Sequence, residues 1–384
     1  MKRKLVILTE IIAPYRIPVF NALARRESID LHVIFLAETD PTLRQWQVYK
    51  DEIGFSYQVL RSWRRRLGKH NVLLNGGVVS ALRRASPDAI LCGGYNYVAS
   101  WQSLFWARRH RVPFSLWVES TVRDFRAGSR LVEFLKARFM HGCDQFIVPG
   151  KAAFEYVINY GAPEESIFTA PNAVDTKFFA ERTEAVRRDA ATYRRMLRLP
   201  SRFFLFVGRL VREKGVFDLL EAYDTLAPNL RSEIGLVFMG DGAARSELEQ
   251  QARAIAPGTI LFPGFAQREQ LASYYALAEM FVFPTHTDPW GLVVNEAMAC
   301  GLPVICTTVA GCVSDLVEDR WNGRVVMARE SQQLAFAMEE LANNAELRSQ
   351  MGQRSRERIL RYSPEACAAG IANAVLSAEP IFHA

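Results

Sequence analysis

Two carboxylates stand close together in the segment Asp288-Pro-Trp290-Gly-Leu-Val-Val-Asn-Glu296. A run with helical spacing begins after the Pro-Trp-Gly turn and stops at a glycine and a proline, at 301 and 303. The start of such a helix attracts a diphosphate, because its first backbone N–H groups have no partner inside the helix. Asp288 and Glu296 can accept hydrogen bonds from hydroxyl groups on either side of that diphosphate. The N–H groups expected to face it are those of Gly291, Leu292 and Val293.

A second segment, Val207-Gly208-Arg209-Leu-Val-Arg-Glu-Lys214-Gly215, places two cations where a strand passes into a helix. Gly208 permits close approach of the backbone, and Arg209 and Lys214 can bind phosphate oxygens. A Gly-Arg turn of this kind can also be purely structural. The functional interpretation is favoured by the 288–296 segment, which is suited to the same ligand, a diphosphate.

Two glycine turns are further candidate ligand-binding segments. Met239-Gly240-Asp241-Gly242 follows a strand, and Phe262-Pro-Gly264-Phe265 is a turn whose backbone can hydrogen-bond a nucleobase. Each has a plain structural interpretation: Gly-Asp-Gly makes ordinary turns, and the two phenylalanine rings can pack in a core.

No residue pattern predicts a bound metal. The sequence has no Asp-x-Asp pair, no Glu/His cluster and no Walker glycine loop, and four histidines show no metal-ligand spacing: His32, His70, His110 and His141. If a diphosphate leaves during the reaction, its charge must then be met by Arg209, Lys214 and the helix that starts at Gly291. The sequence therefore predicts a metal-independent site without a cofactor.

The elements that position these residues alternate between short apolar runs and amphipathic stretches, the rhythm of a parallel sheet with crossover helices. The first half reads as strands at 5–8, 31–36, 89–92, 114–118 and 145–148, with helices at 18–26 and 98–109. After an Arg-rich stretch, 183–199, strands follow at 203–207, 234–239, 259–262, 280–283 and 304–306. A length of 384 residues also favours two domains. We expect an α/β protein of two doubly wound, Rossmann-like domains joined near 176–200.

Ligands of open α/β sheets bind beyond the carboxyl ends of the strands. In the first half those positions hold Tyr15 and Arg16, Gly94 with Tyr95 and Asn96, and Glu119. Two rows of strand ends facing each other would form a cleft between the domains.

Composition indicates a globular protein with reduced cysteines. A hydrophobic content of 49% with 23% charged residues describes a globular chain. The six cysteines show no Cys-x-x-Cys spacing, so we expect reduced, buried thiols and a cytoplasmic protein. The basic start Lys2-Arg-Lys4 precedes an apolar run that Glu10 and Pro14 cut short, which favours a buried strand over a signal peptide.

Positive charge is concentrated in the first half. Residues 1–175 contain 24 Lys and Arg against 16 Asp and Glu, a net charge of +8, while the remainder has 23 against 25, or −2. Aromatic and basic residues alternate in two segments, 61–69 and 106–111. They are either solvated helix ends and loops or a surface for anionic lipid or an anionic acceptor. No nucleic-acid recognition motif accompanies the charge.

Taken together, these motifs resemble a family. The segments at 207–215, 239–242, 262–265 and 288–303, preceded by Pro171-Asn172-Ala-Val-Asp175-Thr-x-Phe178-Phe, occur in the order and spacing of the GT4-type retaining glycosyltransferases, glycosyl transferases group 1, of the GT-B fold. The resemblance extends from about 145 to 375. It implies an acceptor-side domain, 1–178, completed by a C-terminal helix within 363–384, and a donor-binding domain, 179–362.

The resemblance also implies roles for the site residues. Arg209 and Lys214 would bind the diphosphate of a UDP- or GDP-linked sugar, and the backbone near Phe265 the base. Glu296 would bind the ribose, and Asp288 with the amides of 291–293 the sugar and phosphate. Trp290 and the turns at Gly208, Gly240 and Asp241 belong to the same donor site. Transfer would occur by front-face attack, the departing phosphate helping to deprotonate the acceptor.

Two positions depart from the family pattern. The first carboxylate is usually Glu, and here it is the shorter Asp288. A Gly-Gly pair is also common after the first strand, where this chain has Pro14-Tyr15-Arg16-Ile-Pro18. Acceptor contacts by Tyr15, Arg16, Gly94, Tyr95 and Asn96 are therefore the least constrained part of the prediction.

Two further residues have alternative interpretations. Glu119 follows a strand where similar enzymes place a polar residue against the donor sugar, but it can equally pair with Arg123. His286 either borders the donor site or only shapes its loop.

The predicted function is transfer of a hexose from a nucleotide diphosphate sugar to a hydroxyl of a glycan, lipid-linked or small-molecule acceptor, with retained configuration. A role in envelope polysaccharide or glycoconjugate synthesis, on the inner face of the membrane, fits the basic first half. The alternatives are a GT-B-like sugar-nucleotide epimerase or phosphorylase and a non-enzymatic sugar-nucleotide sensor.

Overall fold

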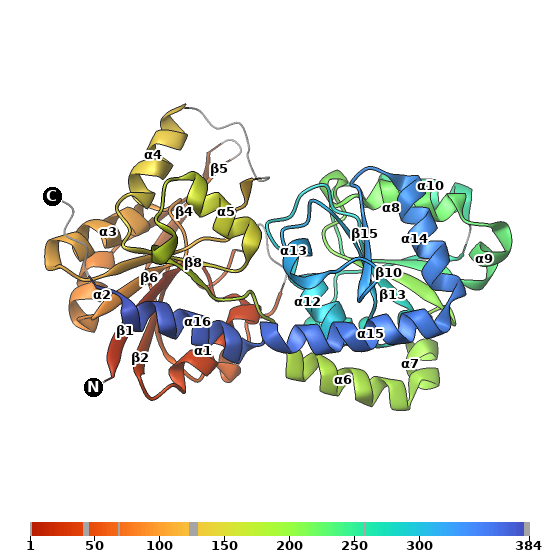
Figure 1. Ribbon diagram of the computed structural model, residues 1–384, viewed down its shortest axis with the longest axis horizontal. Coiled ribbons are helices and arrows are strands. Elements are labelled where there is room, and N and C mark those ends of the chain that lie inside the picture. Colours follow the sequence, from red (N-terminus) through yellow and green to blue (C-terminus); the bar gives the residue numbers. More distant parts are fainter. Residues whose placement is uncertain (1, 41–45, 68–69, 123–129, 257, 380–384) are drawn as a thin grey trace. The chain divides into compact units, whose positions relative to one another are not determined.

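The chain folds into two compact units, and the computed structural model describes residues 2–40, 46–67, 70–122, 130–256 and 258–379 (Figure 1). Unit 1 comprises residues 1–174 and 363–384, and unit 2 comprises residues 175–362. The sequence-based division follows residue 178, whereas unit 2 begins at Asp175. The Asp175 side chain accepts a hydrogen bond from the Phe178 N–H at 3.0 Å and so starts the first helix of unit 2.

Unit 1 is built on a seven-stranded parallel sheet in the order β3-β2-β1-β6-β7-β8-β9. Its strands are β1 (Arg3–Thr9), β2 (Ile29–Phe35), β3 (Ser56–Val59), β6 (Ala89–Cys92), β7 (Phe114–Trp117), β8 (Gln145–Val148) and β9 (Ile167–Thr169). A separate antiparallel hairpin is formed by β4 (Ser62–Leu67) and β5 (His70–Asn75). The helices are α1 (Ile17–Ala24), α2 (Val78–Ala85), α3 (Val98–His110), α4 (Arg130–Met140), α5 (Lys151–Asn159) and α16 (Pro364–Ser377), with short 3₁₀ turns η1 (Pro14–Arg16), η2 (Lys50–Glu52) and η4 (Glu164–Ser166).

Both faces of the unit 1 sheet are buried. Successive side chains of a strand point to opposite faces, so Val6 and Leu8 pack with helices α2, α3 and α5, whereas Leu5 and Ile7 pack with α1 and α16. The C-terminal helix α16 is therefore part of the unit 1 core. Arg3 fastens its end by donating a hydrogen bond to the Leu376 carbonyl at 3.0 Å.

Unit 2 has a six-stranded parallel sheet in the order β12-β11-β10-β13-β14-β15. The strands are β10 (Phe203–Val207), β11 (Gly235–Met239), β12 (Ile260–Gly264), β13 (Met280–Phe283), β14 (Val304–Thr307) and β15 (Gly323–Val326). The helices are α6 (Thr176–Arg188), α7 (Ala190–Leu197), α8 (Val216–Thr225), α9 (Pro228–Glu233), α10 (Arg245–Ile255), α11 (Arg268–Leu277), α12 (Leu292–Ala299), α13 (Val313–Leu316), α14 (Ser331–Asn343) and α15 (Ala345–Ile359), with 3₁₀ turns η5 (Arg212–Lys214) and η6 (Leu360–Tyr362).

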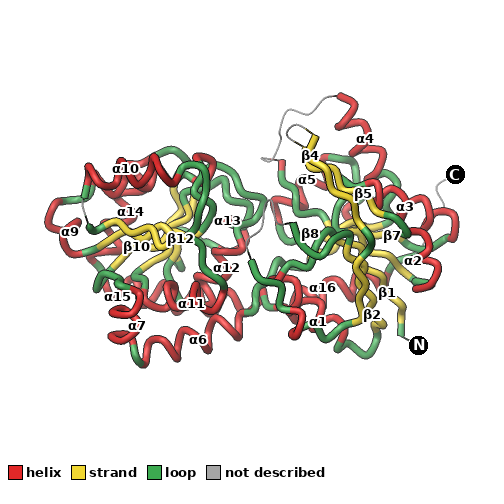
Figure 2. Tube along the Cα trace, turned by 180° about the vertical axis from the view of Figure 1, so that it is seen from behind, coloured by secondary structure: helices red, strands yellow, loops and turns green. Residues whose placement is uncertain are grey.

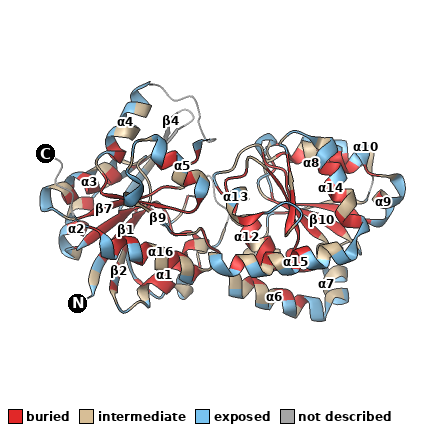
Figure 3. Cartoon of the chain, in the orientation of Figure 1, coloured by how far each residue is buried: buried red, intermediate tan, exposed pale blue. Residues whose placement is uncertain are grey.

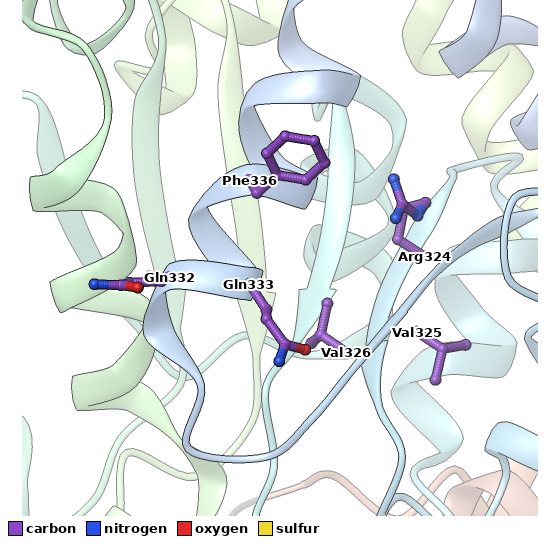
Figure 4. Close-up of a pocket in the computed structure, with 6 residues that line it drawn as sticks. All are labelled: Arg324, Val325, Val326, Gln332, Gln333 and Phe336. Atoms are coloured by element: carbon purple, nitrogen blue, oxygen red, sulfur yellow. The ribbon is translucent and has the colours of Figure 1, made fainter.

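Apolar layers cover both faces of this sheet as well. Phe204 and Phe206 pack with α8, α10 and α14 on one face. On the other face, the Tyr275 ring of α11 lies between Phe179 of α6 and Phe281 of β13, at centroid distances of 6.1 and 5.7 Å. The central strands of both sheets are buried, as Figure 3 shows.

Several predicted elements differ from the observed ones. The Arg-rich stretch 183–199, read as a junction, lies largely within α6 and α7, and the buried Phe179 and Val186 of α6 anchor it to unit 2. The hairpin β4–β5 replaces the loop expected at 61–69, of which residues 68–69 lie outside the described part. The strands β3, β9 and β15 were not predicted, because they are edge strands of only three or four residues.

All six cysteines are free and buried, as predicted. Cys92, Cys143 and Cys367 belong to unit 1, and Cys300, Cys306 and Cys312 to unit 2. Burial raises the pKa of the Cys92 thiol to about 11 and that of Cys367 to about 12. The thiols of Cys92 and Cys367 therefore stay protonated at neutral pH.

Candidate functional site

The sheet of unit 2 has a topological switch point between β10 and β13. Strand order runs from β10 outward through β11 and β12 on one side and through β13, β14 and β15 on the other. The loops that leave the carboxyl ends of β10 and β13 therefore diverge, which is where open α/β sheets bind ligands. These two loops carry Gly208, Arg209, Lys214 and Asp288.

Lys214 and Asp288 meet at this switch point. The Lys214 Nζ lies 2.5 Å from the Asp288 Oδ2 and 3.2 Å from the Thr287 carbonyl oxygen. Both side chains are largely shielded, with 12% and 19% of their surfaces exposed. The second carboxylate oxygen, Oδ1, accepts a hydrogen bond from the Trp290 N–H at 3.0 Å. Protein groups thus occupy both oxygens of Asp288, and the carboxylate holds the lysine ammonium in place.

The two loops are locked against each other. Gly215 has a φ of 67°, and a Cβ at this position would overlap the Pro284 carbonyl, so only glycine fits. The Thr285 hydroxyl donates to the Glu213 carbonyl at 3.2 Å, and the His286 N–H donates to the same carbonyl at 2.9 Å. Lys214 stands between these contacts and is fixed by them.

His286 shapes the loop. Its Nε2 lies 2.6 Å from the Asp218 Oδ2 of helix α8, and its exposed fraction is small. The imidazole therefore ties the loop after β13 to α8, in line with the structural alternative.

Helix α12 begins where the sequence predicts. Gly291 has a φ of 96° at the N-cap, and a Cβ there would press on the Phe283 ring. The first N–H groups of the helix, including those of Leu292 and Val293, have no partner within it and form the positive end of its dipole. Trp290 is 5% exposed, and its indole N–H donates to the Asn295 Oδ1 at 2.8 Å, so its side chain is used within the protein.

Glu296 lies one turn into α12. The Tyr275 hydroxyl donates a hydrogen bond to its Oε2 at 2.9 Å. Burial raises the pKa of Glu296 to about 7, and the hydrogen bond from Tyr275 offsets part of that rise. The carboxyl group is therefore poised to change charge near neutral pH. Tyr275 was missed by sequence reasoning, because it sits in an apolar helical run that gives no local signal.

The remaining donor-side residues line the ends of β10, β11 and β12. The Gly208 N–H donates to the Met239 carbonyl at 3.0 Å, and the Gly240 N–H to the Gly264 carbonyl at 2.8 Å. A Cβ on Gly240 would overlap the Gly208 carbonyl, so the glycines there allow three loops to touch. The Asp241 carboxylate caps the next N–H, that of Gly242, at 2.7 Å.

Two side chains in this region point to solvent. Arg209 is exposed, and among the residues the structure describes its guanidinium has no hydrogen bond or ion pair. Phe265 is 44% exposed, whereas Phe262 stacks on Phe238 at 5.2 Å in the interior. The core-packing interpretation thus holds for Phe262 and not for Phe265.

In unit 1 the loops after β1 and β7 bring Arg16 and Glu119 together. Their contact, from the Arg16 Nη2 to the Glu119 Oε2, is 2.9 Å long. The Arg16 side chain is 10% exposed and lies 4.4 Å above the Trp117 ring. Burial works against the charge of Arg16, but Glu119 and Tyr15 outweigh it, and its pKa is raised overall. Glu119 pairs with Arg16, 103 positions earlier; the expected partner Arg123 lies outside the described residues.

The other predicted residues of unit 1 lie at neighbouring strand ends. The Tyr15 ring packs edge-on against Trp46 at 5.9 Å. Gly94 and Asn96 follow β6, and the Asn96 side chain is exposed. The Tyr95 hydroxyl lies 3.2 Å from that of Tyr156 on α5, so it contributes to packing between elements.

Comparisons with known proteins agree with this arrangement. The family model described as "Glycosyl transferases group 1" matches residues 192–358, and the one described as "Glycosyltransferase Family 4" matches residues 20–178. The chain belongs to the GT4-like group 1 glycosyltransferases. The first of these matches spans every donor-side residue described above, from Gly208 to Glu296.

Among curated relatives of this glycosyltransferase chain, a putative teichuronic acid biosynthesis glycosyltransferase of Bacillus subtilis is 39% identical over 118 residues, which cover 31% of this chain and 28% of the relative. A D-inositol 3-phosphate glycosyltransferase of Paenarthrobacter aurescens is 32% identical over 205 residues, covering 52% of this chain and 49% of the relative. The matched part therefore spans less than half the length of these relatives.

Solved structures extend the likeness to the whole chain. The crystal structure of an Anabaena protein, HepE, in complex with UDP has a TM-score of 0.76 at 19% identity and covers 98% of this chain and 100% of that one. Two parallel-sheet α/β units with this likeness make up the GT-B fold of the glycosyltransferases.

Two findings concern membranes and metals. No helix in the described ranges combines the length and apolar character needed to cross a membrane. In the same part of the chain, no cluster of three or more His, Cys, Asp or Glu side chains is arranged to hold a metal ion.

Proposed function

We propose that the chain transfers a hexose from a nucleotide diphosphate sugar to a hydroxyl group of an acceptor, with retention of configuration. The observation that carries the proposal is the Lys214 ammonium, fixed by Asp288 at the switch point of unit 2 beside the start of α12. A cation and a helix N-terminus aimed at one place suit a diphosphate. The HepE structures with UDP and with UDP-glucose support a nucleotide-sugar ligand for this fold.

Catalysis would rest on the leaving diphosphate. When the bond between the anomeric carbon and the diphosphate oxygen breaks, the electron pair moves to that oxygen, and negative charge grows there. Lys214, Arg209 and the N–H groups of α12 stabilise this charge more in the transition state than in the bound donor. The acceptor hydroxyl attacks from the same face, and its proton passes to the departing phosphate oxygen.

Asp288 has a positioning role in this proposal. Both of its oxygens are engaged by protein groups, one by Lys214 and one by the Trp290 N–H. Its shorter side chain, compared with the glutamate common in the family, keeps it beside Lys214. The sugar contact that the resemblance implies would then come from the N–H groups of 291–293.

Glu296 would bind the ribose. An ionised carboxylate accepts hydrogen bonds from two neighbouring hydroxyls, whereas the protonated acid accepts fewer. Tyr275 orients it by donating to one oxygen.

Glu119 would bind sugar hydroxyls through its exposed carboxylate oxygen. Arg16 holds the other oxygen at 2.9 Å and fixes the orientation of the group. Arg16 is thus a positioning residue in this proposal.

The proposed nature of the acceptor is supported by the charge of residues 1–175 and by one relative. Residues 1–175 have a net charge of +8, from 24 basic and 16 acidic residues, which suits an anionic or lipid-linked acceptor in the envelope and a peripheral place on the cytoplasmic face of the membrane. The relative from Bacillus subtilis named for teichuronic acid biosynthesis is in keeping with this proposal.

The test is incubation with a panel of UDP-, GDP- and ADP-hexoses, first by thermal shift, since a ligand that binds the folded state raises its melting temperature. The donor that gives the largest shift is then offered with glycan and lipid-linked acceptors, and the anomeric configuration of the product is read by nuclear magnetic resonance. A retained anomer supports the proposal, and an inverted anomer contradicts it. A new sugar nucleotide formed without acceptor would point to an epimerase, and dependence on inorganic phosphate to a phosphorylase.

The proposed reaction needs no metal ion. The charge on the leaving diphosphate is met by Lys214, Arg209 and the start of α12. Activity should therefore survive EDTA. Loss of turnover on chelation that Mg²⁺ restores would overturn this part of the proposal.

A further inference from the structure

Helix α4 of unit 1 turns Glu133 and Lys136 toward the protein, while large apolar residues of its first two turns face solvent. This is the reverse of a helix on the surface of an ordinary globular protein. In Figure 1 the helix projects from the body of unit 1, and Figure 3 shows that only its C-terminal end is buried.

The inward face is held by a polar cluster. The Lys136 Nζ lies 3.1 Å from the Glu133 Oε1, and the Tyr160 hydroxyl donates to the Glu133 Oε2 at 2.6 Å. The same ammonium lies within 6.0 Å of the ring centroids of Tyr95, Tyr156 and Tyr160. Phe139 and Met140 anchor the last turn in the core. The orientation of α4 is thus fixed by groups on one side only.

The outward face is apolar and basic. Leu131, Phe134 and Leu135 are 65%, 63% and 44% exposed, and exposed Arg138 follows one turn later. Spacings of three and four residues place all four on one side of the helix. Each exposed apolar side chain costs hydration free energy that a packed surface avoids. A contiguous set on one helix face indicates a binding surface.

The hairpin β4–β5 offers a second surface of the same chemistry. Trp63 and Leu74 face each other across the two strands and are 54% and 40% exposed. Arg65 shares their face by the two-residue period of a strand and is exposed, while Leu73 on the opposite face is buried in the core. Strand β5 packs on α3, as does α4 through the contact between Phe139 and Trp101 at 5.0 Å. Figures 1 and 2 show the hairpin and α4 projecting from the same end of unit 1.

We propose that α4 and the hairpin dock on an anionic lipid surface. We call Leu131, Phe134, Leu135, Arg138, Trp63, Leu74 and Arg65 the docking face. The apolar side chains would enter the boundary between headgroups and acyl chains, and the arginines would stay among the lipid phosphates. Tryptophan is favoured at that depth. A helix of 11 residues is too short to span a bilayer, which needs about 20, so α4 would lie in the plane of the surface.

Charge decides between a lipid surface and a second copy of the chain. The docking face presents arginines, and residues 1–175 carry a net charge of +8, from 24 basic and 16 acidic residues. Two such faces would repel each other, whereas anionic headgroups attract basic residues near the surface. The face therefore fits anionic lipid better than a copy of itself.

The structure moves the lipid contact away from one of the segments that the sequence suggested. In the segment 106–111, Trp106 is buried and stacks on His110 at 4.2 Å. Arg108 pairs with the buried Asp144 at 3.0 Å. That segment is structural, and of the two basic-aromatic segments only 61–69 presents part of the docking face.

The test measures co-sedimentation of the full chain with vesicles of phosphatidylglycerol and phosphatidylcholine, and with phosphatidylcholine alone. The variant Leu131→Gln with Phe134→Gln should weaken binding to the anionic vesicles about tenfold or more, because it removes two inserting side chains. The matched control is Met327→Gln with Phe336→Gln in unit 2, where the side chains are 54% and 65% exposed. The control should bind as the unaltered chain does.

A second pair of variants tests the charges. Arg65→Gln with Arg138→Gln should weaken binding to anionic vesicles and reduce its salt dependence, while Arg253→Gln, whose side chain is 80% exposed in unit 2, should change neither. Equal binding to both vesicle types, or equal binding by the Leu131/Phe134 variant and its control, would overturn the proposal. So would a change from dimer to monomer in sedimentation velocity caused by the Leu131/Phe134 variant alone.

The proposal does not depend on the proposed sugar transfer, because its readout requires no turnover. The unfolding transition of unit 1 in differential scanning calorimetry serves as the folding check, since α4 and the hairpin belong to unit 1. Each variant should keep that transition. A variant that loses the transition together with vesicle binding is misfolded, and its partner substitution made singly, Phe134→Gln or Arg138→Gln, then decides the matter.

Discussion

At the residue scale, a double-mutant cycle can test whether Asp288 acts through its contact with Lys214. Lys214→Ala should lower kcat about 10²- to 10³-fold, because the lost charge stabilises the leaving diphosphate. Asp288→Asn should lower kcat less, since it keeps an acceptor for the Trp290 N–H but no longer holds the ammonium. If Asp288 acts through Lys214, the double variant should be no worse than Lys214→Ala.

The outcome separates positioning from direct binding. Additive losses in the double variant would mean that Asp288 contacts the sugar by itself. Arg212→Ala is the matched control, because Arg212 lies two positions from Lys214 but pairs with the exposed Glu247 at 2.6 Å. It should leave kcat nearly unchanged, and near-normal turnover of Lys214→Ala at saturating donor would remove Lys214 from the mechanism.

Glu296 should make donor affinity depend on pH. Burial raises its folded pKa from 4.5 to about 7, so the acid form is favoured as pH falls below about 7. Ribose hydroxyls donate to the ionised form, and binding should therefore weaken as pH falls from about 8 to about 6. By the same linkage, the group's cost to folding is absent below pH about 4.5 and complete above about 7.

Isothermal titration calorimetry with a nucleotide sugar measures this dependence, since its diphosphate diester does not titrate near neutral pH. Glu296→Gln should bind more weakly at high pH and show a flat profile. A profile that Glu296→Gln leaves unchanged would assign the titration to another group.

Not every site residue behaves as its position in the sequence suggests. Glycines at 208, 215, 240 and 291 are predictable, because backbone approach and positive φ leave few alternatives. Trp290 looks like a ligand contact in sequence, yet its indole is used by Asn295. The pairing of Arg16 with Glu119 and of Lys214 with Asp288 joins residues 103 and 74 positions apart, so no local pattern could give it.

At the element scale, the short turn η5 depends on Gly215. Gly215→Ala should destabilise unit 2 by about 1 kcal/mol from the positive φ alone and by more from the overlap with the Pro284 carbonyl. The overlap would also displace Lys214, so affinity for the donor should fall. Thermal unfolding and donor titration measure both effects.

Gly258→Ala is the matched control within the same unit. Gly258 has a φ of 86°, but a Cβ there would meet nothing within 4 Å. It should show only the smaller, conformational cost and keep donor affinity. Equal effects at the two positions would show that backbone strain, and not the contact between the loops, accounts for the change.

Elements with strong periodicity are the predictable ones. The apolar runs at 203–207 and 280–283 coincide with β10 and β13, because each is a buried central strand. Helix α4 was not predicted, since Leu131, Phe134 and Leu135 face outward, and Glu133 and Lys136 contact tyrosines from the end of α5 and the loop after β6. Its inverted pattern is visible only when the partners of Glu133 and Lys136 are known.

At the scale of the whole molecule, α16 belongs to the core of unit 1 although it ends the chain. Ile371→Ala should destabilise unit 1 by about 2–5 kcal/mol, because Ile371 is fully buried between α16 and the sheet. Affinity for the nucleoside diphosphate should be unchanged, since the residues expected to bind it lie in unit 2. Met338→Ala is the matched control in unit 2, where it should lower the stability of that unit instead.

Differential scanning calorimetry with and without the nucleotide sugar distinguishes the units. The ligand should raise the transition of unit 2 alone, and Ile371→Ala should lower the other. A single transition that moves as a whole in both experiments would mean that the units unfold together. The two-domain organisation is predictable from repeated strand and helix rhythm, but assignment of the last helix to the first unit needs contacts such as that of Arg3 with Leu376.

The six buried thiols can report how fast each unit opens. Each unit holds three, and none is accessible in the folded state. A thiol reagent should therefore react only as fast as the surrounding structure opens, and mass spectrometry of the labelled peptides reports each unit separately. The labelling rate of Cys367 reports the release of the C-terminal helix α16. The labelling rate of Cys312, which lies close to Asp288 and Trp290, reports the opening of the loop after β13. Ligands that close one unit should slow its three reactions and leave the other three unchanged.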